Sequence, residues 1–121
     1  MRKQAVEDKR AEIEKVEEEI SKIEDYKIYY ALREYKYKKI SPQTIELTKV
    51  IIALNKLNIP ITCDTVYYFG DTLSSKSNLY LKLHNLGDKH VLLLKRKEGL
   101  LEWVIHPCFK KLLVKYSLLE E

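Results

Sequence analysis

The 121-residue sequence predicts a mostly helical α+β fold, in which a long amino-terminal helix precedes one small domain. No Gly or Pro occurs before Pro42, and the apolar residues of this first segment recur at helical spacing. Downstream, three capped helical segments come before two apolar runs that flank a Glu-Gly pair, and a last helical segment follows. We expect a helical arm over residues 1–39 and one domain over residues 40–121, because the chain is too short for two cores.

The first segment carries a heptad pattern of apolar residues between charged ones. Its apolar positions are separated by seven, three, four and three residues: Val6, Ile13, Val16, Ile20 and Ile23. A single helix over about residues 3–37 buries only this narrow stripe, and such a helix needs a partner. We expect the stripe, extended to Tyr30, to form a coiled coil with a second copy of the chain, in parallel or antiparallel orientation. The alternative is a helix that folds back on its own domain.

Residues 27–39 combine five basic residues with four tyrosines. Interleaved aromatic and basic side chains can stack on bases and neutralise phosphates. Alternatively, the tyrosines form a core face where the helix meets the domain. With either alternative, three lysines are candidates for phosphate contacts: Lys36, Lys38 and Lys39.

Two helices are expected to open the domain. Ser41 is a typical N-cap, and Pro42 suits the first position of the helix that follows. Thr62 is expected to cap a short helix over residues 63–69, which Gly70 ends.

A third helix and a hairpin follow. The helix is expected to begin at Ser74 or Ser75 and to stop at Gly87. Its inward residues, at helical spacing, are Leu79, Leu83 and Leu86. The apolar runs 91–97 and 100–105 predict a β-hairpin in which Gly99 supplies a positive φ, and Trp103 is expected in the core beneath it. A final helix opens at His106-Pro107.

The positive charge is concentrated in the carboxyl-terminal part. Residues 1–25 contain 6 Lys and Arg against 9 Asp and Glu, whereas residues 26–121 contain 16 against 9. Such an excess suits a polyanion such as nucleic acid, although a solubilising surface has a similar composition. The abundance of Lys and Glu is also typical of proteins from hot environments.

The run SKSNLYLKLHNLGDKHVL, residues 75–92, resembles the recognition helix of winged helix-turn-helix DNA-binding proteins, in particular small ones of archaea and their viruses. In that pattern a Ser-Lys-Ser-Thr start leads to Val-Tyr, Leu and Leu at helical spacing. The resemblance covers residues 41–106. It departs at His90, where many members carry Gly, and in a longer turn between the second and third helices. The fold also serves as a protein-binding module.

The resemblance implies that the third helix enters the major groove of duplex DNA and that the hairpin wing touches the backbone or minor groove. A step of 100° per residue turns the polar residues of the third helix outward, and the first-turn amides with Ser74 and Ser75 offer an anion site. The candidate DNA contacts on this helix are Ser74, Ser75, Lys76, Ser77, Asn78, Tyr80, Lys82, His84 and Asn85. Those at the hairpin tip are Lys95, Arg96 and Lys97.

Leu81 leaves two function classes open. It is an apolar residue among the outward positions, where it suits either a thymine methyl group or a protein interface, and no arginine accompanies it. We expect a homodimeric protein that binds double-stranded DNA, either at an operator or with little sequence preference, as a transcriptional regulator. The alternative is a non-enzymatic adaptor or assembly protein that uses the winged helix and the coiled coil for protein contacts.

No pattern in the sequence predicts catalysis, a cofactor or a metal site. The best nitrogen and sulfur ligands lack paired metal-ligand spacing: Cys63, His84, His90, His106 and Cys108. The sequence has no glycine-rich phosphate loop and no nucleophile elbow.

The sequence also carries no sign of a membrane segment. No apolar run approaches the roughly 20 residues that span a bilayer, and the first residues are charged. We therefore expect no membrane partner and a cytoplasmic location.

Overall fold

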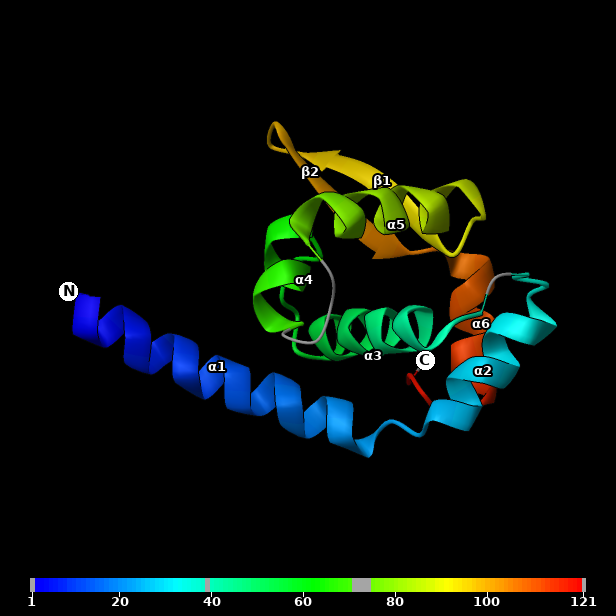
Figure 1. Cartoon of the computed structure of the whole chain (residues 1–121), viewed down its shortest axis with the longest axis horizontal. Helices are drawn as coiled ribbons and strands as arrows, with labels where there is room; N and C mark the ends of the chain where they lie inside the picture. Colours follow the sequence, from blue (N-terminus) through cyan, green and yellow to red (C-terminus); the bar gives the residue numbers. More distant parts are fainter. Residues whose placement is uncertain (1, 39, 71–74, 121) are drawn as a thin grey trace.

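A computed structural model describes the backbone of residues 2–38, 40–70 and 75–120, and their side chains other than those of residues 2–10 and Lys97 (Figure 1). In chain order the elements are α1 (Arg2–Lys22), α2 (Asp25–Glu34), α3 (Pro42–Lys56), α4 (Cys63–Phe69), α5 (Lys76–Asp88), β1 (Leu92–Lys97), β2 (Leu100–Ile105) and α6 (Pro107–Lys115). The two strands pair antiparallel, which confirms the mostly helical α+β class. Within the described residues, every helix is too short or too polar to cross a membrane.

The elements surround a hydrophobic core. In Figure 1 the hairpin β1–β2 lies on one side of α5, and α3 lies on the other. α4 contacts both α3 and α5, while α2 contacts α3 and α6. The three leucines expected on the inner side of α5, Leu79, Leu83 and Leu86, are all buried. The opposite side of α5 therefore faces outward.

The expected single helix over about residues 3–37 is wrong, because the chain breaks between α1 and α2. Glu24 has an extended backbone, with φ −89° and ψ 129°, and stands at the N-cap of α2. The break places Ile23, which is 6% exposed, in the core. Asp25 in the first turn of α2 forms an ion pair with Lys49 of α3. The break allows α2 to pack against α3 and α6, and such tertiary packing supplies most of the stability of helices in proteins.

The carboxyl-terminal half of α1 packs on its own domain. Val16 is fully buried and Ile20 is half-buried against the core, where α1 contacts α3. Ile13 is half-buried and Tyr30 is exposed, while the side chain of Val6 lies outside the described residues. The first turns of α1 project past α4 in Figure 1. The helix thus folds back in its second half and leaves its first half without a neighbouring element in that view.

The expected helix starts are confirmed. The Ser41 hydroxyl caps α3, and Thr62 with Thr65 forms a reciprocal capping box at the start of α4. Gly70 follows the last residue of α4 as expected. Ser75 caps α5 by accepting a hydrogen bond from a first-turn amide. Local sequence chemistry therefore decides where these three helices begin.

The expectation that Gly87 stops the third helix is wrong. α5 continues to Asp88, and His90 adopts a left-handed backbone with φ 62°. The Val91 amide donates to the Leu86 carbonyl over 2.9 Å, as in a Schellman motif. The same left-handed position after α2, α3 and α6 is occupied by Lys36, Asn58 and Ser117. His90 thus adopts a conformation that glycine favours, and it directs the chain into β1.

The hairpin forms as the turn residues predict. Glu98 and Gly99 make the two-residue turn with φ 52° and 82°, values that match the twist of the strands. Trp103 of β2 is buried beneath the hairpin, as expected. A Cβ on Gly87 would stand 2.7 Å from the Trp103 Cζ3 atom. Glycine is therefore needed here because α5 and β2 approach each other closely.

Candidate nucleic-acid interface

The side of α5 that points away from the core forms the candidate interface. We call it the α5 face, and its residues are Ser77, Asn78, Tyr80, Leu81, His84 and Asn85. All are exposed except His84, which is half-buried. Ser75 and Lys76 are exposed at the start of the helix, whereas Ser74 lies outside the described residues.

A row of aromatic rings joins the α5 face to the hairpin. The ring centroids of Tyr80 and His84 are 4.3 Å apart, and those of His84 and Trp103 are 5.1 Å apart at an angle of 83°. The edge-to-face contact with a buried indole holds the His84 imidazole in place. Tyr80 remains 54% exposed at the outer end of the row. The spacing of Tyr80 and His84 by four residues predicts their contact, but nothing in the sequence pairs them with Trp103.

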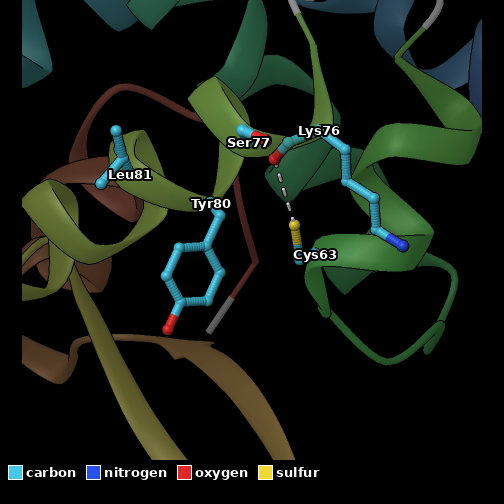
Figure 2. A pocket seen from close by; sticks show the side chains of 5 residues that line it. All are labelled: Cys63, Lys76, Ser77, Tyr80 and Leu81. Carbon is cyan, nitrogen blue, oxygen red and sulfur yellow. Dashed lines mark hydrogen bonds between the residues drawn. The ribbon is translucent and has the colours of Figure 1, made fainter.

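A shallow hollow of about 520 Å³ lies beside the α5 face, lined by Cys63, Lys76, Ser77, Tyr80 and Leu81. Figure 2 shows Cys63 of α4 directed at the start of α5, where its thiol donates a hydrogen bond to the Lys76 carbonyl over 3.8 Å. Burial raises the pKa of the Cys63 thiol, and this effect outweighs the opposing charge of Lys76. The thiol therefore remains protonated at neutral pH. Sequence reasoning did not place Cys63 at this surface, because only the packing of α4 on α5 brings it there.

Both lysines of α5 have partners within the protein. Lys76 forms an ion pair with Asp64 of α4, and hydrogen bonding to this carboxylate raises the pKa of Lys76. Lys82 donates a hydrogen bond to the Gln43 side chain of α3. In Figure 2 the Lys76 side chain extends away from Leu81. The two amines therefore lie at the flanks of the α5 face and leave its centre uncharged.

A second hollow of about 410 Å³ joins the segment after α2 to the far end of α5. It is lined by Tyr37, Lys38, Asn85, Asp88 and Lys89. The structure thus brings Lys38 close to Asn85. In the sequence, Lys38 belongs to the basic segment before the domain and Asn85 to the expected third helix. Lys36 is also exposed, and Lys39 lies outside the described residues. Lys89 was missed by sequence reasoning because it follows the last turn of the helix.

The hairpin tip carries both basic and apolar side chains. Lys95 and Arg96 are exposed, and they stand opposite Glu102 and Leu101 in the hairpin register. The side chain of Lys97 lies outside the described residues. Four leucines of the hairpin are also exposed: Leu93, Leu94, Leu100 and Leu101. The sequence pattern identifies these leucines only as strand residues and does not predict their exposure.

The tyrosines of α2 and the segment after it form two groups, one half-buried against the domain and one exposed. Tyr35 and Tyr37 are half-buried, and the Tyr35 hydroxyl donates to the His90 carbonyl over 2.7 Å. Tyr29 and Tyr30 remain exposed and contact each other edge to face, with centroids 5.8 Å apart. Tyr35 and Tyr37 thus hold the segment after α2 against the domain.

Comparison with protein families, with curated proteins and with solved structures found no match for this chain. The arrangement of the described residues is therefore the basis for a functional proposal. Among those residues, no three His, Cys, Asp or Glu side chains gather as metal ligands.

The α5 face has exposed basic residues in two neighbouring segments, which we call its flanks. One flank is the hairpin with Lys95 and Arg96, and the other is the segment with Lys36 and Lys38. The face itself presents hydroxyl, amide, imidazole and apolar groups. Such a surface can hydrogen-bond to polar edges and pack on apolar groups while its flanks attract negative charge.

Proposed function

We propose that this chain binds double-stranded DNA through a winged helix-turn-helix formed by α3, α4 and α5, with the hairpin β1–β2 as the wing. The observation that supports this proposal most strongly is the exposed α5 face between two basic flanks. A B-DNA major groove about 12 Å wide admits a helix, and phosphates then line both sides of it. Lys95 and Arg96 of the hairpin, and Lys36 and Lys38 after α2, are exposed, and in this proposal they contact those phosphates.

The charge distribution supports a polyanionic partner. The excess of 16 Lys and Arg over 9 Asp and Glu in residues 26–121 lies in the part that contains these flanks. Phosphate contacts supply most of the affinity for DNA irrespective of sequence, because each one releases condensed counterions. Contacts from the α5 face to base edges then add sequence preference.

The proposal includes a homodimer that acts as a transcriptional regulator. Its support is that the first turns of α1, which contain Val6 of the expected seam, project past α4 (Figure 1). Val16, Ile20 and Ile23 of the expected seam pack on the core of their own chain. A dimer contact in α1 therefore uses its first half, and two DNA-binding domains joined there would meet two half-sites.

Salt dependence tests the proposed role of the wing. Replacing Lys95 and Arg96 by Ala is expected to weaken duplex binding and to lower the slope of log affinity against log salt concentration by about 2, one for each lost phosphate contact. The measurement is fluorescence anisotropy with a labelled duplex at several salt concentrations.

A matched control removes two exposed lysines elsewhere. The variant Lys110→Ala/Lys111→Ala has the same change in net charge on α6, which packs against α2. It is expected to retain the wild-type slope. Equal slopes for both double variants would remove the hairpin from the DNA-binding surface.

A second candidate function is that of a non-enzymatic adaptor or assembly protein. The observation that favours it is the exposure of leucines on the hairpin, including Leu100 at 73%, together with Leu81 on α5. Exposed apolar patches often mark protein contacts. An adaptor of this kind has only feeble affinity for duplex DNA, so the same salt titration separates the two candidates.

A further inference from the structure

The centre of the α5 face is apolar. Leu81 is 59% exposed and stands next to Tyr80, and both line the hollow of about 520 Å³ beside the start of α5. Figure 2 shows both side chains projecting from α5, with Cys63 of α4 beside Tyr80. A ligand that covers this centre gains free energy by burying apolar groups of its own there.

The same centre lacks the groups that most often read guanine. α5 contains no arginine, and the amines of its two lysines bond to Asp64 and Gln43. Arginine or lysine donating to guanine O6 and N7 is the commonest specific contact in the major groove. A G·C pair therefore finds no strong partner at the centre of the α5 face.

Thymine is the base that does match this centre. Its C5-methyl group is the apolar feature of the unmodified base pairs in the major groove. Asn78 and Asn85 are exposed three residues before Leu81 and four residues after it, which places their amides one helical turn to either side of Leu81. An asparagine amide can bond to adenine N6 and N7 together. The order Asn, Leu, Asn along the helix thus fits neighbouring A·T pairs.

We infer that the preferred DNA is A·T-rich duplex, recognised in the major groove by thymine methyl groups that pack on Leu81 and Tyr80. This inference rests on the proposed DNA-binding function and adds the class of sequence that is bound.

Replacing thymine by uracil in the probe tests the inference, because it removes the methyl group and keeps the base pairing. Anisotropy would compare an A·T-rich duplex, the same duplex with uracil, and a G·C-rich duplex with and without 5-methylcytosine. The thymine duplex is expected to bind about fourfold more tightly than the uracil duplex for each methyl group that becomes buried. 5-Methylcytosine is expected to raise the affinity of the G·C-rich duplex, because it restores a methyl group at the same position.

Protein variants identify the residue responsible. Leu81→Ala is expected to abolish the difference between thymine and uracil duplexes, and it leaves the fold intact because the side chain is exposed. The matched variant Lys95→Ala/Arg96→Ala is expected to weaken both duplexes and keep their ratio. Circular dichroism would check that each variant folds.

The outcomes separate the two proposals. Equal affinity for thymine and uracil duplexes, or an unchanged ratio in Leu81→Ala, would overturn the inference and leave DNA binding in place. A wild-type protein that binds none of the four duplexes at low salt would overturn the proposed function itself.

Discussion

At Gly87 the helix α5 and the indole ring of Trp103 approach so closely that no Cβ fits between them. A Cβ at this position would lie 2.7 Å from Cζ3 and 3.0 Å from Cη2 of the ring. Trp103 in turn contacts His84 through the edge-to-face pair. A small residue in α5 thus fixes the distance between the candidate DNA-contacting helix and the hairpin.

Gly87→Ala is expected to destabilise the protein although it raises helix propensity. Alanine gains about 1 kcal/mol over glycine inside a helix, whereas forcing an extra methyl group into a tight contact costs about 1–3 kcal/mol. The free energy of unfolding, measured by urea denaturation, is therefore expected to fall by about 1 kcal/mol. The exposed position Ser77 on the same helix serves as the control, since Ser77→Ala meets no packed ring. A more stable Gly87→Ala protein would contradict the close approach of α5 and β2.

Some residue roles follow from local chemistry and others do not. The caps at Ser41, Thr62 and Ser75 were predictable, because a hydroxyl side chain in front of a helical pattern accepts bonds from free amides. The left-handed backbone of His90 was not, since it depends on where the packed helix ends. The burial of Lys49 beside Asp25 was also missed, because it arises only when α2 packs on α3.

Among the elements, α1 shows how one apolar pattern can have two uses. A heptad stripe can be buried by a second chain or by the protein's own domain. The structure buries Val16 and Ile23 within the chain, and local spacing cannot distinguish these outcomes. The hairpin was more predictable because Gly99 and the two apolar runs specify it locally. The exposure of its leucines depends on which elements cover the strands, so it was not predictable.

The two halves of α1 are expected to respond differently to change. Val16→Asp places a charge at a fully buried position and is expected to lower the free energy of unfolding by about 3 kcal/mol or more. Deleting residues 2–10 is expected to leave the fold intact and to shift the mass in sedimentation equilibrium from that of a dimer, which is about twice 14.4 kDa for the full-length protein, toward that of one shortened chain.

A control variant and two possible outcomes test these predictions for α1. Glu17→Ala next to Val16 changes an exposed residue and is expected to leave stability nearly unchanged. A stable Val16→Asp protein would show that α1 does not pack on α3 in solution. A full-length protein with a mass of 14.4 kDa would exclude the dimer.

At the scale of the whole molecule, the candidate site combines the consecutive elements α5 and β1–β2 with the segment after α2, which is distant in sequence. The α5 face lies between the hairpin tip and the segment after α2, where Lys38 and Asn85 line one hollow. The outward residues of α5 were predictable from helical spacing and the burial of Leu79, Leu83 and Leu86. The aromatic row to Trp103 and the partners of Lys76 and Lys82 were not, because they depend on tertiary contacts.

The most direct test of DNA binding is fluorescence anisotropy of the wild-type protein with a labelled mixed-sequence duplex, titrated at several salt concentrations. The proposed surface predicts a micromolar or lower Kd at low salt. Phosphate contacts from Lys36, Lys38, Lys95 and Arg96 predict a slope of log affinity against log salt concentration of about −3 to −4. Absence of binding at low salt would contradict the proposal and favour the adaptor function.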